Sequence, residues 1–459
     1  MATLRVAIIG SGPAAFYAAE HLLKQTGNAV QVDMFDRLPT PFGLVRGGVA
    51  PDHAKIKSVT KVYEKIAANP RFRFFGNVEF GSHIALADFR AHYHQILYAT
   101  GAQTDRRMNI PGEDLRGSHP ATEFVAWYNG HPDYRDCHFD LSQERVAVIG
   151  VGNVAIDVAR ILCRTRDELT KTDIADHALE ALCASRVKEV YLIGRRGPVQ
   201  AAFTAPEIKE VGEMQDADVF ARADEVALDP LSRAELEKEN DLANVRKVET
   251  IQAYAARQPS GKSRKLFLRF LMSPVELFGD ASGRVTKMRL VRNTLVASES
   301  GALSAQATDQ FEELEVGLVF RSVGYRGVAL PDVPFHDKWG VILNEKGRVL
   351  DPESKQSRVG EYVAGWIKRG PSGVIGTNKP DSVETANAML EDAQRDATMQ
   401  PAHADPLSAE NLIRARQPRF VSFADWQTLD RLELQRGAAQ GRPRVKFTRV
   451  EAMLRAVGK

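Results

Sequence analysis

The sequence has few cysteines, and none of them stands in a pattern that forms a disulfide framework or a metal site. Its 459 residues include three cysteines, Cys137, Cys163 and Cys183. No two of them have the C-x-x-C spacing of a redox dithiol or of a zinc or iron–sulfur site. The sequence therefore predicts no bound metal and no cluster of its own. Such sparse cysteine usage also favours a reducing compartment.

Long apolar segments and a charge excess are missing as well. Apolar runs such as Val146 to Ile149 have the length of a strand, far below the ~20 residues of a membrane span. Lysine and arginine number 61 against 59 acidic residues, a net charge of +2 that argues against a nucleic-acid partner. The first strand begins by Leu4, which leaves no room for a signal or transit peptide. We expect a monomeric bacterial cytoplasmic protein, or one that has already been processed, without membrane or nucleic-acid partners.

What the sequence does contain is one pattern used twice. Residues 4–15 and, about 140 residues later, 145–155 each pass from a β-branched apolar run through a glycine turn into a helical pattern. This order is typical of the first strand, turn and helix of a doubly wound α/β sheet. Because 459 residues also exceed the size of a single core, the sequence predicts at least two α/β domains.

Hydrophobic periodicity and turn residues predict the remaining elements. The Pro- and Gly-rich stretch 39–51 is predicted to be a loop, and 206–310 a polar helical insertion followed by antiparallel strands such as 266–270 and 286–291. Helices are expected over 14–25, 54–68, 153–163 and 382–394, in a stretch continuing to Cys183 and in the last 60 residues; strands are expected over 30–35, 95–101, 189–193, 318–324 and 362–366.

The first glycine motif predicts an FAD site. In G-x-G-x-x-A, Gly10 makes the tight turn, Gly12 leaves room for a pyrophosphate, and Ala15 lets the helix pack closely on the strand. The helix N-terminus then faces the phosphates with its partial positive charge. Asp36 ends the next strand, where a carboxylate can accept hydrogen bonds from the ribose hydroxyls. The simpler alternative is a tight turn that binds nothing.

The second motif predicts an NADP(H) site. Gly150, Gly152 and Ala155 repeat the first geometry, but the following strand ends in Arg195 and Arg196 instead of an acid. Losing the carboxylate removes repulsion toward a 2′-phosphate, and two guanidiniums supply bidentate contacts. The alternative is a solvated strand end.

Two dinucleotide sites imply hydride transfer from nicotinamide C4 to flavin N5, held roughly 3–3.5 Å apart. Without a cysteine pair or cluster in the chain, the electrons have to leave to an external acceptor. A dithiol–disulfide reductase is therefore disfavoured.

Taken together, the motifs resemble those of one protein family. The chain resembles the adrenodoxin-reductase-like ferredoxin–NADP⁺ reductases, including their bacterial members, through segments in the same order from the N-terminus to beyond residue 370: 10–20, 38–53, 72–78, 150–157, 194–200 and 365–377. The resemblance implies that a domain binding NADP (105–325) is inserted into a domain binding FAD (1–104 and 326–459). It implies the function of an NADPH:ferredoxin oxidoreductase that takes a hydride onto FAD and passes two electrons singly to a ferredoxin.

The resemblance and the two motifs together give the predicted cofactor residues. Asp36 stands where the family usually has Glu, so the shorter acid is expected to weaken the ribose contact or to make it through water. The predicted FAD set is Gly10, Gly12, Pro13, Ala14, Ala15, Asp36, Leu44, Val78, Gly101, Trp366, Gly373, Val374 and Ile375. The predicted NADP set is Gly150, Gly152, Asn153, Val154, Arg195, Arg196 and Glu207, with Gly373 also near the nicotinamide.

His53 and Asp157 are the candidates for proton handling near the flavin, since the family places these positions close together. Hydride transfer to N5 requires no protein acid, so a purely structural hydrogen bond is the competing interpretation. For docking an acidic ferredoxin, the candidates are Arg160 with Arg164, four residues apart on one helix, and the run Arg442, Arg444, Lys446 and Arg449.

Two other functions fit the tandem nucleotide motifs. One is the flavin module of a larger NADPH-dependent complex, although such modules usually carry cysteine-rich segments. The other is a non-catalytic nucleotide-binding redox sensor.

Overall fold

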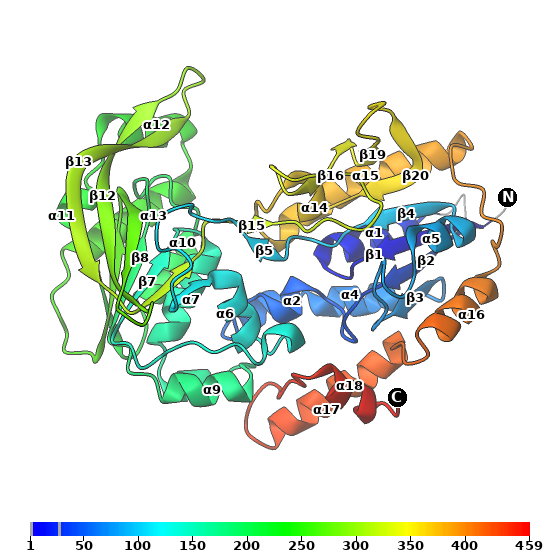
Figure 1. The fold of residues 1–459 in the computed structure, drawn as a ribbon, viewed down its shortest axis with the longest axis horizontal. Coiled ribbons are helices and arrows are strands. Elements are labelled where there is room, and N and C mark those ends of the chain that lie inside the picture. The colour runs from blue at the N-terminus through cyan, green and yellow to red at the C-terminus, as the bar shows by residue number, and fades with distance from the viewer. Residues whose placement is uncertain (1–2, 26–28) are drawn as a thin grey trace. The chain divides into compact units, whose positions relative to one another are not determined.

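The chain forms two compact units, the second inserted into the first. The computed structural model describes residues 3–25 and 29–459. Unit 1 comprises Met1–Thr104, Asn129–Pro132 and Tyr325–Lys459, and unit 2 comprises Asp105–Tyr128 and Asp133–Gly324. Each unit contains a largely parallel sheet with helices, as Figure 1 shows. The predicted fold class, two Rossmann-like α/β folds with one inserted in the other, is confirmed.

Unit 1 is built on a seven-stranded sheet in the order β18-β19-β20-β4-β1-β2-β3. Strand β1 lies inside this sheet, parallel to β2 on one side and to β4 on the other, and all six of its residues are buried. Its unbroken apolar run is what a strand covered on both faces requires. The strands are β1 Leu4–Ile9, β2 Val30–Phe35, β3 Phe72–Phe75, β4 Gln95–Tyr98, β18 Asn344–Glu345, β19 Arg348–Leu350 and β20 Ser357–Val363, with a short antiparallel pair, β16 Phe335–His336 and β17 Val341–Ile342.

Among the described helices of unit 1, α15 is the longest, and it packs against α1. Aromatic side chains fix α1 to α4, because the Phe16 and Tyr63 rings stack with centroids 4.8 Å apart. The helices are α1 Pro13–Leu23, α2 Leu44–Gly47, α3 Ala54–Lys57, α4 Thr60–Ala67, α5 Leu86–His92, α14 Trp366–Arg369, η2 Ile375–Thr377, α15 Asn378–Gln394, α16 Pro406–Arg416, α17 Phe423–Ala438 and α18 Val450–Ala456.

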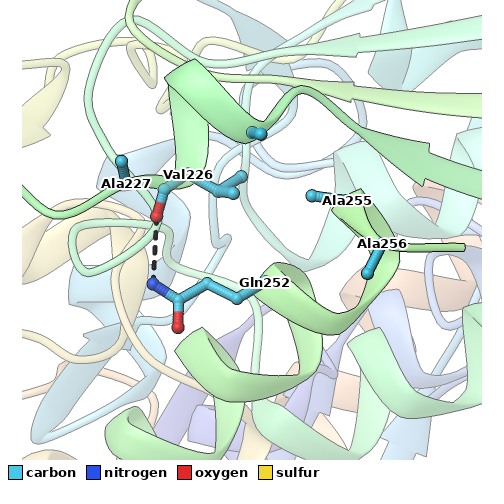
Figure 2. Close-up of a pocket in the computed structure, with 6 residues that line it drawn as sticks. Val226, Ala227, Gln252, Ala255 and Ala256 are labelled. Atoms are coloured by element: carbon cyan, nitrogen blue, oxygen red, sulfur yellow. Dashed lines mark hydrogen bonds between the residues drawn. The ribbon is translucent and has the colours of Figure 1, made fainter.

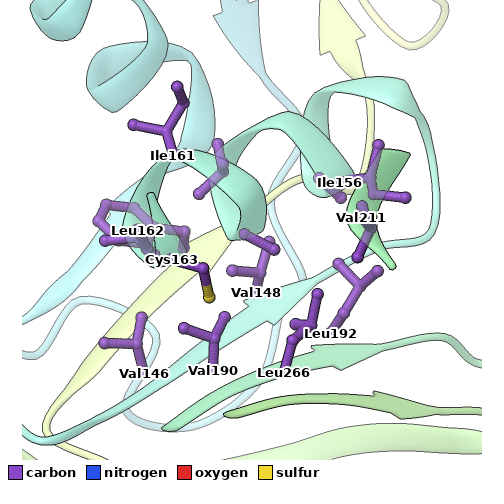
Figure 3. Close-up of a cluster of buried hydrophobic side chains, with 14 of the residues drawn as sticks. Val146, Val148, Ile156, Ile161, Leu162, Cys163, Val190, Leu192, Val211 and Leu266 are labelled. Carbon is purple, nitrogen blue, oxygen red and sulfur yellow. The ribbon is translucent and has the colours of Figure 1, made fainter. Parts of the chain in front are cut away.

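Unit 2 has a six-stranded, wholly parallel sheet in the order β6-β14-β7-β8-β10-β9. Helix α7 lies over this sheet, and Figure 3 shows Ile156 and Cys163 of the helix above Val148, Leu192 and Leu266 of three strands. The strands are β6 Ser118–Pro120, β7 Arg145–Ile149, β8 Glu189–Ile193, β9 Ala217–Ala221, β10 Arg264–Arg269 and β14 Leu318–Arg321.

A separate antiparallel sheet and eight helices complete unit 2 among the described residues. The sheet contains β11 Met272–Gly279, β12 Val285–Ala297 and β13 Leu303–Glu315. The helices are α6 Ala121–Tyr128, α7 Asn153–Cys163, α8 Arg166–Leu169, α9 Asp176–Cys183, α10 Ala205–Val211, α11 Ala223–Val226, α12 Pro230–Glu239 and α13 Leu242–Ala255; a 3₁₀ turn, η1, spans Pro132–Tyr134, and the short strands β5 Thr104–Asp105 and β15 Tyr325–Arg326 pair where the chain passes between the units.

Several expectations from the sequence need correction. The strand at 266–270 is β10, which runs parallel between β8 and β9 rather than antiparallel, because Leu266 and Leu268 belong to the core of the parallel sheet. The stretch 39–51 contains the short helix α2, and the helix expected over 54–68 is broken into α3 and α4 around Ser58. Trp366 does not end a strand but begins α14.

Candidate functional site

The first glycine turn joins β1 to α1 and has the shape of a phosphate cradle. Gly10 has a φ of +103°, and a Cβ there would clash with the carbonyl oxygen of Ala99. A Cβ on Gly12 would meet nothing within 4 Å, so this position leaves open space. Helix α1 begins after Gly12 with Pro13 in its first turn and no side-chain cap, which leaves backbone N–H groups for an anion. Ala14 and Ala15 are buried beneath the turn.

Asp36 follows β2 at the edge of this turn. Its carboxylate accepts a short hydrogen bond from the Ser11 hydroxyl, and its Oδ1 accepts another from the Leu38 amide at 2.9 Å. Burial raises the pKa of the Asp36 carboxyl, although these two donors oppose the shift. The acid is therefore fixed in direction before any ribose hydroxyl reaches it.

The loop after Asp36 folds back onto the glycine turn. The Phe42 amide donates to the Ser11 carbonyl at 3.0 Å, and a Cβ on Gly43, whose φ is +49°, would lie 2.9 Å from the Gly12 Cα. Leu44 then begins α2 beside the turn. Val78 is buried and its amide donates to the Asp36 carbonyl at 2.9 Å. The structure thus brings Leu44 and Val78 to the predicted FAD motif.

A second loop of unit 1 carries the residues predicted to contact the isoalloxazine. Trp366 is half-buried, and its Nε1 donates to the Ser372 carbonyl at 3.2 Å. Gly373, with a φ of +77°, and Val374, 51% exposed, precede η2 and α15, so this turn presents open backbone. Gly101 follows β4, has a φ of +70°, and also faces open space.

Sequence reasoning missed the polar contacts that hold this loop. The Asp381 carboxylate accepts from the Gly365 amide at 2.6 Å and pairs with the Lys368 ammonium at 3.0 Å, so α15 is tied to the residue before Trp366. Gly365 has a φ of +80°, and a Cβ there would lie 2.7 Å from the Ala14 Cβ of α1. Sequence spacing gives no signal for these contacts, because Asp381 lies 16 residues from Gly365 and 13 from Lys368, and Ala14 lies near the other end of the chain.

The second glycine turn, between β7 and α7, repeats the first. Gly150 has a φ of +132°, and a Cβ would clash with the Ser322 carbonyl oxygen, whereas a Cβ on Gly152 would meet nothing within 4 Å. Helix α7 begins with Asn153 and Val154 and has no side-chain cap. The buried Asn153 Oδ1 has no hydrogen-bond partner within the described ranges. An unmet acceptor and uncapped amides fit a nucleotide pyrophosphate and its sugar here.

Arg195 and Arg196 follow β8, one strand away from this turn. Their carbonyls are fixed by the Asn293 Nδ2 (2.9 Å) and the Leu271 amide (3.1 Å), while the Arg195 side chain is exposed and that of Arg196 half-exposed. No carboxylate in residues 3–25 and 29–459 lies within 4.0 Å of either guanidinium, so both are available to a phosphate. Glu207, also predicted here, closes a capping box at α10, where its carboxylate accepts from the Thr204 amide at 3.0 Å.

His53 and Asp157 lie in different units. His53 is buried and caps α3, where its carbonyl accepts from the Ile56 amide at 3.1 Å. Asp157 is buried on α7 and pairs with the Arg160 guanidinium of the next turn at 2.7 Å. A proton-handling role for the pair stays a prediction, and the Asp157–Arg160 ion pair shows that the acid has a structural contact within its own helix.

The two predicted docking surfaces for a ferredoxin are largely wrong, because of their residues only Arg449 is exposed. Arg160 is fully buried, and Arg164 is held by Glu168 at 2.5 Å. In the C-terminal run, Arg442 and Lys446 are buried, and the Arg444 guanidinium pairs with Asp430 (2.6 Å) and Glu433 (2.9 Å). These arginines serve internal contacts, because Glu433 is a buried acid that also binds Arg46 at 2.6 Å.

Outside the two glycine turns, other features of the described residues are a pocket, the cysteines and the possible metal ligands. An apolar pocket of about 330 Å³ lies between α11 and α13, and no cationic side chain lines it. Figure 2 shows the Gln252 amide donating to the Val226 carbonyl at this pocket. All three cysteines are free thiols, and burial raises the pKa of Cys163 to about 12. Within the described ranges no His, Cys, Asp and Glu cluster suited to a metal ion occurs, and none of their helices is long and apolar enough to cross a bilayer.

Comparison with known proteins agrees with the geometry. A family model described as pyridine nucleotide-disulphide oxidoreductase matches residues 4–193. NADPH-ferredoxin reductase FprA of Mycobacterium tuberculosis is 46% identical over 98% of both chains. The mitochondrial NADPH:adrenodoxin oxidoreductase of Arabidopsis thaliana is 40% identical over 99% of this chain and 95% of its own.

A solved structure of Mycobacterium tuberculosis FprA in complex with NADPH superimposes with a TM-score of 0.93 at 44% identity, covering 99% of this chain and 100% of that one. This similarity spans both α/β units and both glycine turns. The chain belongs to the adrenodoxin-reductase-like family of ferredoxin–NADP⁺ reductases, which are flavoprotein oxidoreductases.

Proposed function

We propose that this protein is an FAD-dependent NADPH:ferredoxin oxidoreductase. The observation that carries the proposal is a pair of matching glycine turns with opposite partners: an acid at Asp36, and at Arg195 and Arg196 two guanidiniums that pair with no carboxylate of the described residues. The relatives whose printed names are NADPH-ferredoxin reductase and NADPH:adrenodoxin oxidoreductase support the same assignment. Unit 1, residues 1–104 and 326–459 in the main, would bind FAD, and unit 2, within 105–325, would bind NADP(H).

The residues of unit 1 fit FAD in a definite order. The open space at Gly12 and the uncapped amides of α1 would take the pyrophosphate, and Asp36 would accept from the ribose. Leu44 and Val78 flank that turn. The turn at Gly373, Val374 and Ile375 would direct amide groups at the flavin ring, with Trp366 beside it.

In unit 2, Gly152, Asn153 and Val154 would bind the NADP pyrophosphate, and Arg195 with Arg196 its 2′-phosphate. A nicotinamide held by unit 2 would supply a hydride, and an FAD held by unit 1 would accept it and could release electrons one at a time. Within residues 3–25 and 29–459 no cysteine pair or cluster could store an electron. The acceptor is therefore external, and a ferredoxin with a one-electron cluster fits that requirement.

His53 and Asp157 are proposed to hold or move a proton near the reacting ring, without being needed for hydride transfer itself. His53→Gln and Asp157→Asn should each change the pH profile of kcat/KM if they do so. If the variants lose stability but keep the pH profile of the wild-type protein, His53 and Asp157 have only a structural role.

The experiment that tests the function is purification followed by two assays. The protein should be yellow, with one FAD per chain, and should reduce both a small artificial acceptor and a ferredoxin with NADPH. A colourless protein that takes up no FAD would refute the proposal. Oxidation of NADPH with the artificial acceptor separates an enzyme from a redox sensor. Sedimentation tests the further proposal that the protein is a monomer, and fractionation of its host tests whether it is cytoplasmic.

A further inference from the structure

One buried ammonium in unit 2 has no role in the mechanism above. Lys247 lies on α13 and is only 6% exposed. Its Nζ donates to the carbonyls of Val199, at 3.1 Å, and Ala201, at 2.5 Å. No carboxylate of residues 3–25 and 29–459 lies within 4.0 Å of it. Burying a cation without an ion-pair partner is costly, and an apolar side chain of equal length would avoid that cost.

The two carbonyls belong to segment 197–203, which connects the predicted phosphate-binding arginines to α10. On one side of this segment, the Ala202 and Phe203 amides donate to the Val151 carbonyl at 2.8 and 3.2 Å. Val151 stands between Gly150 and Gly152, inside the second glycine turn. The segment therefore links the arginine pair to the turn through direct backbone contacts.

On its other side, the segment is held by α12 and α13. The Gln200 side chain accepts from the Gly197 amide at 3.1 Å and donates to Glu235 of α12 at 2.5 Å and to Ser232 at 3.3 Å. Lys247 supplies the corresponding contact from α13. Gln200 binds α12, and Lys247 donates to the carbonyls of the two residues that flank Gln200. Together the two side chains fix the path of the chain that follows Arg196.

We infer that Lys247 is a positioning residue for NADP(H), which holds segment 197–203 so that the arginine pair and the glycine turn keep the spacing of an adenosine 2′-phosphate and its pyrophosphate. This inference rests on the proposed function. Freed from Lys247, the segment would let Arg195 and Arg196 move relative to the turn. Binding of the 2′-phosphate should then suffer more than binding of the rest of the nucleotide.

The test uses the FAD-loaded full chain and two small ligands, 2′,5′-ADP and 5′-AMP, titrated calorimetrically at pH 7. Lys247→Met should weaken 2′,5′-ADP binding about tenfold, the effect of losing roughly one charge-assisted hydrogen bond, and change 5′-AMP binding less than about twofold. Lys238→Met, on the exposed side of α12, is the matched control and should alter neither. Equal weakening of both ligands, or no change, would overturn the inference.

A second measurement covers the case in which Lys247→Met does not fold. Burial lowers the pKa of Lys247 to about 8, and the carboxyl groups of Glu239, Asp241 and Glu235 oppose that shift. The 2′-phosphate, with a second pKa near 6 for phosphate esters, keeps its charge above pH 7. In the wild-type protein the preference for 2′,5′-ADP should therefore fall between pH 7 and 9.5, and Lys247→Arg should remove that fall.

A preference that is constant over this range would contradict the inference. If instead the wild-type protein does not bind 2′,5′-ADP at all, the proposed NADPH specificity fails, whatever the variants do. The two failures are thus distinguishable.

Discussion

The two glycine turns share one backbone design and differ in what stands at the end of the next strand. At the first, Asp36 is held by Ser11 and Leu38 before any ligand is present. At the second, Arg195 and Arg196 have fixed carbonyls but open guanidiniums. The turn with a prearranged acid suits a cofactor that stays bound, because little ordering remains to be done on binding. The turn with exposed cations suits a nucleotide that exchanges on every cycle.

The glycines give the largest test of this comparison. Gly10→Ala adds a Cβ against the Ala99 carbonyl at a positive φ, which alone costs about 1–2 kcal/mol. We expect a colourless, destabilised protein. Gly150→Ala makes the equivalent clash with Ser322, so it should stay yellow and fail to bind NADP⁺. The flavin absorbance per protein and an NADP⁺ titration measure both outcomes.

Gly12→Ala is the control for the first turn, because its Cβ would enter open space. The FAD-free protein should then unfold at the wild-type denaturant midpoint while its FAD affinity drops. Should Gly10→Ala and Gly12→Ala lose FAD and stability to the same degree, the division between a backbone constraint and a ligand cradle is wrong.

The arginine pair gives the next largest effect. Replacing both Arg195 and Arg196 by Gln should raise the KM for NADPH far more than that for NADH, by roughly 2–4 kcal/mol, since each charge-assisted contact contributes about 1.5–3 and the two are not fully additive. Arg166→Gln, an exposed arginine of α8, is the matched control. Equal effects on the two cofactors in steady-state kinetics would refute the NADP assignment.

Asp36→Asn should have a smaller effect, raising the dissociation constant for FAD about tenfold through weaker acceptance from the ribose. The pKa of Asp36 is raised by burial, so wild-type FAD affinity should fall as pH decreases through that raised pKa, and the variant should lack this step. In the FAD-free protein the sign is opposite, because the folded state binds the proton more readily than the unfolded chain and acidification relieves the cost of a buried carboxylate. Fluorescence titration of FAD at a series of pH values, in the wild-type protein and in Asp36→Asn, measures the pH dependence of the FAD affinity.

Salt should produce the smallest effect. Docking of a ferredoxin through exposed charges is screened as the Debye length shrinks from about 10 Å at 0.1 M to about 3 Å at 1 M. Hydride transfer between bound nucleotides should respond less. Rates of NADPH oxidation with a ferredoxin and with a small neutral acceptor, measured over the same salt range, compare the two steps. An equal decline in both assays would mean that docking is not steered by charge.

Local patterns predicted the two nucleotide turns well, since β2, α7 and β8 begin and end where the sequence indicated. A glycine turn is encoded by a few neighbouring residues, so it can be predicted without knowing any distant partner. The prediction that Arg160, Arg442 and Lys446 dock a ferredoxin failed because all three are buried, and burial depends on distant parts of the chain. Whether a charged side chain faces solvent depends on what packs against it, and Arg444 meets an acid, Glu433, that also binds Arg46, 387 residues away in sequence.

The same limit applies to β10 and to Lys247. An apolar run of strand length does not reveal whether its neighbours run parallel, and β10 is parallel because β8 and β9 flank it. Lys247 sits in a polar helix where lysine looks solvated. Its role follows only from two carbonyls 46 and 48 residues earlier.

The insertion of unit 2 has a consequence for how the protein is made. Strand β4 (Gln95–Tyr98) pairs with β20 (Ser357–Val363), so the sheet of unit 1 cannot close until some 260 further residues have been synthesised. The strands of unit 2 all lie between them and can assemble earlier on the ribosome. The nascent chain should therefore acquire its nucleotide-binding unit before its flavin-binding one. A chain truncated after Gly324 should accordingly bind 2′,5′-ADP and remain colourless.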